Sequence, residues 1–364
     1  MTTTEILNAL PVTTWNHLRV NAAPKEAALP ERPEAGWGAT NTAYELAEGV
    51  RCVALLPQEC TGLESGLGEA ADLSIHTGAN FSRFFRAEGE SSGITYLRER
   101  LDAEHPYAVT HTAIHAKAGS KITFVQLIQS DAETAGLSAS LTQIAAEPGA
   151  EVTLVQLQLL NPNCRRYNAV SVKAAKDAHV RIVRAELGGS IVVSGARALL
   201  DKTGGAFDLD AIYYGDGDSI LDFNDVAVHT GRDTHSEMHH AGVLADRCRK
   251  TLRGTIDFRR GAVRAVGHES EDVLLFSPEV RHRAAPLILC TEENVEGQHA
   301  ASAGRLDENV LYYLASRGLD PQQAKRLMVD ARFAPVLDKI PDEALRDLTR
   351  ETLERRLEHA QILG

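Results

Sequence analysis

The sequence predicts a mainly β fold, a parallel β-helix (solenoid) flanked by N-terminal and C-terminal helical segments. Apolar and polar residues alternate with a period of two from about residue 107, as in Ile122–Leu127 and Val152–Leu157. Such segments, bounded by Gly, Asp and Pro turns, are typical of strands. No periodic segment of helix length separates them, which excludes a fold of alternating strands and helices.

The turns between these strands recur at a nearly fixed spacing. Three of them place a small or turn residue before an apolar anchor, Ile122, Val152 or Val180, and Phe207 continues the series. The spacings are 30, 28 and 27 residues. A period of roughly 20–50 residues indicates a repeat array. Several strands per period without a helix favour a β-helix over a β-sandwich, whose turns would be more closely and less regularly spaced.

Three regions follow from this pattern. Residues 1–105 are expected to form a helical and mixed region, which begins with an Ala- and Pro-rich arm. Residues 106–304 are expected to form the β-helix core, and residues 305–364 a helical region. In that last region, Gly318 predicts the end of a first helix, Asp320 with Pro321 the start of a second, and Pro341 the start of a third.

Composition excludes several classes of function. The net charge of −12 leaves no excess of Lys and Arg to neutralise phosphates, so nucleic acid is not expected as the main partner. No apolar run approaches the roughly 20 residues of a membrane helix. The segment Met1–Glu5 lacks the features of a secretion signal, and a cytoplasmic protein is expected.

Cysteine usage points away from disulfides and from a locally encoded metal site. No two cysteines form a C-x-x-C pair, so neither a zinc ribbon nor a ferredoxin-type cluster is predicted. Any metal site must use ligands that are distant in sequence or that come from two chains. The five cysteines are scattered: Cys52, Cys60, Cys164, Cys248 and Cys290.

The C-terminal third resembles a known family. The matching segments resemble the C-terminal half of SufB/SufD proteins, the scaffold subunits of the SUF iron–sulfur cluster assembly machinery. A further match, Thr14–Asn21, resembles the family's N-terminal Trp motif. The C-terminal segments that carry the resemblance are Lys250–Gly261, Val266–Leu275, Pro286–Cys290, Glu296–Glu308 and Leu311–Gly318.

This resemblance implies a right-handed parallel β-helix that pairs with a SufB-type chain or with itself. It also implies that the C-terminal helices bind SufC, an ABC-type ATPase, and that a cysteine desulfurase system supplies sulfur indirectly. The chain lacks a Gly-x-x-x-x-Gly-Lys-Ser/Thr loop, so it is expected neither to bind nucleotide alone nor to be an enzyme. The expected docking residues are Leu311, Tyr312, Leu314, Leu327 and Leu337.

Within the family, the junction sequence is closer to SufD than to SufB. His299 is followed by Ala300, where SufB-type chains have a glutamate. The resemblance makes His299 the histidine of the SufD junction and, with Cys290, a candidate ligand of a transient nascent cluster. Imidazole and thiolate both bind iron. The alternatives are a structural role for His299 and a core position for Cys290 at the end of an apolar strand.

Other residues in the sequence have side chains that could also bind a metal ion. Cys248 lies between cationic residues, which would lower its pKa if it were exposed. In the segment His229–His240, the side chains of His235, Glu237 and His239 would share one face of a strand, where a surface or stacking role is the alternative to a metal site. Further on, three carboxylates suit either an incoming ferrous ion or a solvated turn: Glu269, Glu271 and Asp272.

Two other functions stay open at the level of sequence. One is a β-helix enzyme that acts on polysaccharide, which requires two neighbouring carboxylates. The low aromatic content of 5% argues against sugar stacking. The other is a purely structural β-helix partner. The carboxylates that make an enzyme formally possible are Asp208, Asp210, Asp216, Asp218, Asp222 and Asp225.

Overall fold

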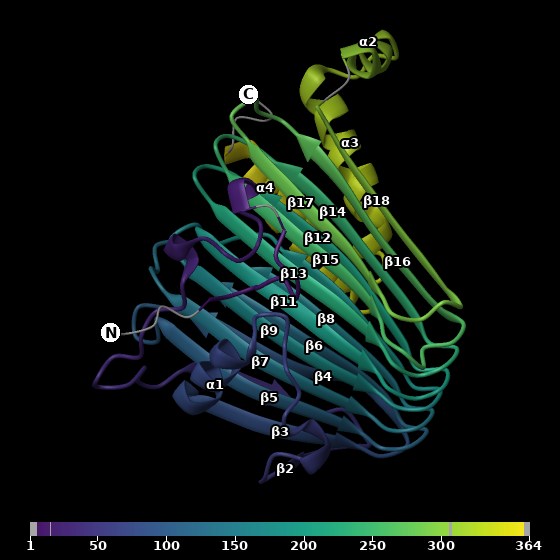
Figure 1. Ribbon diagram of the computed structural model, residues 1–364. Coiled ribbons are helices and arrows are strands. Elements are labelled where there is room, and N and C mark those ends of the chain that lie inside the picture. The colour runs from purple at the N-terminus through teal and green to yellow at the C-terminus, as the bar shows by residue number, and fades with distance from the viewer. Residues whose placement is uncertain (1–5, 15, 306–307, 360–364) are drawn as a thin grey trace.

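The computed structural model describes residues 6–14, 16–305 and 308–359 of the chain. Its body is a parallel β-solenoid made of two nine-stranded sheets, here called sheet A and sheet B (Figure 1). From β3 onward, successive strands alternate between the sheets, and each pairs in parallel with the strand two places along the chain. The predicted β-helix is therefore confirmed.

The strands are long and regular. Sheet A contains β1 (Asn41–Glu45), β4 (Glu90–Leu101), β6 (Lys121–Ser130), β8 (Glu151–Leu159), β10 (His179–Glu186), β12 (Ala206–Gly215), β14 (His235–Leu244), β16 (Ala265–Leu275) and β18 (Val295–Arg305). Sheet B contains β2 (Val50–Val53), β3 (Phe81–Ala87), β5 (Tyr107–Ala116), β7 (Leu137–Ala146), β9 (Arg165–Ala174), β11 (Ile191–Leu200), β13 (Ile220–His229), β15 (Arg249–Phe258) and β17 (Arg281–Cys290).

Helices lie at both ends of the chain. The N-terminal region has three short 3-10 helices, η1 (Asn16–Leu18), η2 (Lys25–Ala27) and η3 (Gln58–Cys60), and one α-helix, α1 (Glu69–Gly78). The C-terminal region has α2 (Glu308–Ser316), α3 (Pro321–Leu337) and α4 (Glu343–His359). No helix in the described ranges is both long enough and apolar enough to cross a membrane.

The register of sheet A explains the sequence period. Ile122 is paired with Val152, Val152 with Val180, and Val180 with Phe207, so one sequence repeat is one turn of the solenoid. All four side chains are buried between the sheets. The connecting turns use backbone with positive φ, for example 70° at Gly149, which is why small turn residues recur there.

The solenoid begins earlier than the boundary expected at residue 106. β3 pairs in parallel with β5, and β4 with β6, so both already belong to the sheets. The N-terminal arm and α1 pack on the outer face of sheet B, where Trp37 and Ile75 contact the same apolar cluster as Leu141. The mixed composition of this region gave no prediction for the four strands that it contains within the described residues, β1 to β4.

The C-terminal helices α3 and α4 cover the outer face of sheet A (Figure 1). Phe333 of α3 and Leu353 of α4 are buried against outward side chains of that sheet, such as Val155. The start of α3 follows the predicted signal, because Asp320 and Gln323 form a capping box. In contrast, α2 projects beyond the sheets at the end of the solenoid that carries β18.

Candidate functional site

The last turn of the solenoid is open. β17 and β18 are the final strands of the two sheets, and within the described ranges neither has a strand on its outer edge. All residues of β18 after Val295 are exposed, whereas all ten residues of β13 are buried. An unpaired edge presents free backbone N–H and C=O groups, so this end is suited to pairing with another chain.

His299 lies on the inward face of β18. Side chains alternate along a strand, so His299 shares a face with Val295, which packs against the core, and with Gly297. A Cβ at Gly297 would lie 2.9 Å from the ring of Phe258, which confirms that this face points into the solenoid. His299 is itself exposed because no further turn covers it.

The strand register places His299 at the end of a column of inward side chains. Along this column, apolar residues give way to polar ones. Pairing runs from Met238 in β14 to Glu269 in β16 and then to His299. Four solenoid turns before Met238 contribute only apolar side chains to the column, and all are buried: Phe124, Leu154, Ile182 and Leu209. Glu269 is only 5% exposed, and burial raises its pKa. The column also begins with a polar residue, Thr95 of β4, but it is apolar from Phe124 to Met238, and a carboxylate and an imidazole occur in it only at the open end.

A second inward column carries buried charges toward the same end. Arg184 of β10 pairs with Asp225 of sheet B at 2.5 Å, and His240 of β14 donates to Asp225 at 2.8 Å. All three side chains are essentially inaccessible to solvent. Although burial acts in the opposite direction, the charge of Arg184 and the bond from His240 hold the pKa of Asp225 well below its usual range.

Glu271 of β16 is the last charged residue of this second column, which continues to Ala301 of β18, and it belongs to a four-residue network. It forms an ion pair with buried Lys250, accepts a hydrogen bond from Tyr213 at 2.6 Å, and lies 3.2 Å from His282 of β17. Burial opposes ionisation, but these partners, Lys250 first, lower the pKa of Glu271 to about 2. His282 is 15% exposed at its side chain, so the network reaches the surface at the open end.

These positions correct the interpretation of the carboxylates in β16. A solvated turn was the alternative to an iron-binding role for Glu269, Glu271 and Asp272, but all three lie in a strand, and the two glutamates are buried. Lys250 and His282 were not singled out in the sequence. The only available signal was that Lys250 begins one family-like segment and His282 lies close to another, because the contacts come from neighbouring turns.

Cys290 lies at the end of β17 and is exposed, not buried in the core. The predicted buried strand Leu287–Cys290 forms, but β17 is an edge strand, so even Ile288 is 37% exposed. Cys290 is paired with Phe258 in sheet B, whereas His299 lies in sheet A. His299 is also four residues into β18, about 13 Å along the strand. The chain therefore does not bring the two candidates to one point.

The remaining predicted candidates have structural partners. Cys248 is fully buried, and burial raises its pKa to about 12, so the flanking cations do not activate it. His229 contacts Thr234 and Ser236 inside the solenoid. His235 and His239 share the outward face of β14, as expected, and His239 contacts Ser270.

The aspartates that would be needed by a polysaccharide-cleaving enzyme are all engaged. Asp225 is buried inside the solenoid, Asp222 is buried on the outer face of sheet B beneath the N-terminal arm, and the other four lie on the surface, each with a basic partner. The pairs are Asp208–His179, Asp210–Lys339, Asp216–Arg356, Asp218–Arg247, Asp222–Arg253 and Asp225–Arg184. These contacts leave no pair of free carboxylates in the group to act as acid and base.

The expected docking residues fall into two groups. Tyr312 of α2 and Leu327 of α3 are 78% and 47% exposed, and Leu311 and Leu314 are half-buried. Leu337 is only 2% exposed and packs against sheet A, so the structure removes it from any docking surface. The exposed apolar surface of α2 also includes residues that were not predicted, Val310 and Tyr313.

Comparison with known proteins agrees with this architecture. Residues 99–332 match the family model described as "SUF system FeS cluster assembly, SufBD core domain". The iron-sulfur cluster assembly protein SufD of Bacillus subtilis is 25% identical over 249 residues, which cover 68% of this chain and 57% of the relative.

Two further relatives have similar coverage. An iron-sulfur cluster assembly SufBD family protein of Mycobacterium tuberculosis is 28% identical over 231 residues, 61% of this chain and 58% of the relative. The SufD protein of Escherichia coli is 20% identical over 239 residues, 66% of this chain and 56% of the relative. The chain thus spans less than three fifths of the length of these curated relatives.

Proposed function

Because the chain belongs to the SufB/SufD family, we propose that it is a SufD-like scaffold subunit for iron–sulfur cluster assembly. In this proposal it pairs with a SufB-type chain or with a second copy of itself. It also binds a SufC-type ABC ATPase and supports the assembly and transfer of a nascent cluster. The cluster is cargo that is held transiently, and sulfur reaches it indirectly from a cysteine desulfurase system.

One observation carries this proposal: the inward column changes from apolar residues to Glu269 and His299 at the unpaired end of the solenoid. A solenoid that served only as a spacer would gain stability from apolar side chains there. A neutral imidazole is instead a ligand for iron. His299 is exposed in the single chain, so a nascent cluster can reach it before or during pairing.

The placement of the candidate ligands also supports pairing. Cys290 and His299 lie on different sheets of the last turn. A cluster bound by His299 therefore requires further ligands from elsewhere, and a strand that adds to the edge of β18 would bring them. The small side chains after His299, from Ala300 to Gly304, allow another backbone to approach closely.

The surface proposed for ATPase docking is the exposed part of α2 and α3. Tyr312, Tyr313 and Leu327 combine large apolar area with high exposure, which is typical of the centre of a protein interface. α3 continues from this surface down along sheet A, where Phe333 is fully buried. A force applied at α2 would thus be transmitted to the sheet that carries His299.

Co-purification with a SufC-type ATPase from the same organism tests the docking surface. Tyr312→Glu should reduce the captured ATPase at least tenfold, because a charge would be placed in an apolar contact. Asn163→Glu, an exposed change in the turn before β9 and outside α2 and α3, is the matched control. Equal capture by Tyr312→Glu and the wild type would refute this docking surface. Deletion of residues 307–364 is less suitable, because it would uncover sheet A.

A further inference from the structure

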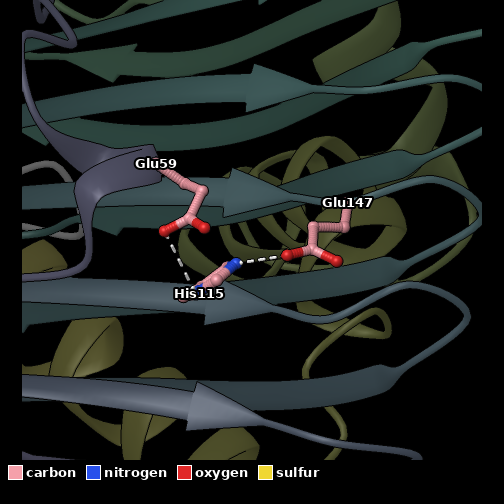
Figure 2. A group of neighbouring side chains, drawn as sticks. All are labelled: Glu59, His115 and Glu147. Carbon is pink, nitrogen blue, oxygen red and sulfur yellow. Dashed lines mark hydrogen bonds and ion pairs between the residues drawn. The ribbon is translucent and has the colours of Figure 1, made fainter.

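A second cluster of ligand-type side chains lies near the other end of the solenoid. Glu59 comes from η3, His115 from β5, and Glu147 follows β7 (Figure 2). One ligand atom from each lies within 4.8 Å of the others, and no other such group occurs among the residues that the structure describes. Along sheet B, β7 is five strands from β17, about 24 Å at the usual strand spacing. The cluster is therefore separate from the open end.

The hydrogen bond to Glu147 determines which nitrogen of the neutral His115 ring carries a hydrogen. Nε2 of His115 lies 2.8 Å from Oε1 of Glu147, so Nε2 carries a hydrogen and donates it. In the neutral ring the lone pair is then on Nδ1. His115 is 1% exposed, and its Nδ1 is buried without a hydrogen-bond partner among the residues that the structure describes. A carboxylate that orients a histidine through its other nitrogen is a common support for a metal ligand.

The lone pair of Nδ1 faces a carboxylate. Nδ1 of His115 lies 3.6 Å from Oε2 of Glu59, too far for a hydrogen bond, and both atoms are acceptors (Figure 2). Two ligand atoms that are each about 2.1 Å from one ion at a tetrahedral angle lie about 3.4 Å apart. The gap between the two atoms therefore has the size that a small divalent ion requires.

The two carboxylates of the cluster differ in how their negative charges are balanced. Glu147 pairs with Lys117 at 2.5 Å and also accepts a hydrogen bond from the backbone N–H of Ala118. Partial burial opposes its ionisation, but Lys117 and His115 lower its pKa. Glu59, in contrast, has no ion-pair partner other than His115 within the described ranges. A cation next to Nδ1 would balance the charge of Glu59.

The backbone that carries Glu59 is held firmly. The next residue, Cys60, is fully buried and packs between Ala113 and Ala145. Its thiol also lies 3.9 Å from the carbonyl oxygens of Ile114 and Gln143. Glu59 is therefore fixed beside β5 at its backbone, while its side chain stays 46% exposed and accessible to an incoming ion.

We propose that this cluster is a binding site for a divalent transition-metal ion. Nδ1 of His115 and the carboxylate of Glu59 are the ligands, water completes the coordination, and Glu147 is a positioning residue that orients the imidazole. Imidazole with a carboxylate suits Zn²⁺, Fe²⁺ and Co²⁺ better than Ca²⁺ or Mg²⁺. The site does not depend on the role proposed for the open end.

Anaerobic titration of the full chain with Co²⁺, followed by visible absorption, tests the site. One equivalent should bind with saturation and should be displaced by Zn²⁺. Glu59→Gln should abolish the saturable signal, and its folding can be checked by its melting temperature because Glu59 is a partly exposed side chain. Glu147→Gln should weaken binding about 10- to 100-fold, as for other residues that orient a metal ligand.

Glu133→Gln, at an exposed position outside the cluster, is the matched control and should bind as the wild type does. Saturable binding of equal affinity in Glu59→Gln would overturn the proposal. So would the absence of saturable Co²⁺ or Zn²⁺ binding in the wild type at neutral pH. An unchanged affinity in Glu147→Gln would remove the positioning role alone.

Discussion

At the scale of residues, Glu271 joins the buried charges of both sheets near the open end. It pairs with Lys250 and accepts from Tyr213, and the side chains of Lys250 and Glu271 are almost fully buried. Glu271→Gln would leave the ammonium of Lys250 without its counter-ion. Because removing one partner of a buried pair typically costs about 3–5 kcal/mol, we expect a loss of this size in the free energy of unfolding. Urea denaturation measures it.

A double variant is the control for this prediction. Replacing both charges, as in Lys250→Met with Glu271→Leu, removes the pair without leaving a buried charge, so it should destabilise the protein less than Glu271→Gln alone. If the single variant lost less than about 0.5 kcal/mol, the pair would contribute little to the stability of the fold.

His229 gives the stability a pH dependence of known sign. Burial, with a smaller contribution from His235, lowers its pKa from 6.5 to about 4. Between these values the unfolded chain binds a proton that the folded chain does not, so the contribution of His229 to stability falls as the pH decreases from 6.5 to 4. At pH 4.5 we expect this contribution to be lower than at pH 7 by on the order of 2 kcal/mol.

Urea denaturation of His229→Gln at the same two pH values isolates that contribution. The variant should lose less stability between pH 7 and pH 4.5 than the wild type, because glutamine does not titrate. Equal losses in both proteins would show that His229 is protonated to the same extent in the folded and unfolded chains.

Residue roles were only partly predictable from the sequence. The family resemblance drew attention to His299, but nothing in the sequence showed that it would follow Glu269 in a column that is apolar from Phe124 to Met238. Glu271 looked like part of a solvated turn because its partner Lys250 lies on the other sheet, 21 residues earlier. Cys290 looked like a core residue because an apolar run does not reveal that its strand lies at an edge.

At the scale of elements, β18 is the strand proposed to pair with another chain. Native proteins prevent edge pairing with charged side chains, particularly lysine. Ala300→Lys would place such a charge in the exposed part of β18 and should weaken association with a SufB-type chain or a second copy at least tenfold. Analytical ultracentrifugation of the purified proteins measures the association constant.

Glu133→Lys provides the control for a changed net charge at an exposed position away from β18. It should associate as the wild type does. An unchanged association constant in Ala300→Lys would place the pairing surface somewhere other than the edge of β18.

Elements were more predictable than residue roles. The C-terminal helices begin and end close to the positions expected from Gly318, Asp320 and Pro341, because capping is decided by local chemistry. The alternating segments Ile122–Leu127 and Val152–Leu157 lie in β6 and β8, as their pattern predicts, whereas the carboxylates of β16 were expected to lie in either a metal site or a solvated turn. The sequence did not predict β3 and β4, because the surrounding region has no clear period. This holds even for β4, which is twelve residues long.

At the scale of the whole molecule, the repeat made the solenoid predictable. Ile122, Val152 and Val180 stack in register as their spacing indicates. The two ends were less predictable, because the sequence does not show which strands lack a neighbour. The sequence did not predict the cluster of Glu59, His115 and Glu147. Glu59 lies in the N-terminal region, which showed no clear pattern, and the other two residues lie in β5 and just after β7. Because the three segments are distant in sequence, no motif joins them.

The proposal that His299 contributes to cluster assembly at the open end is tested most directly by anaerobic reconstitution. The chain, purified together with its SufB-type and SufC-type partners, would be incubated with ferrous iron and sulfide, and the visible absorbance of the cluster measured. His268→Ala is the matched control, because His268 lies on the outward face of the adjacent strand. We expect His299→Ala to lose at least half of the absorbance while His268→Ala retains it. Equal absorbance in His299→Ala and the wild type would contradict the proposed role.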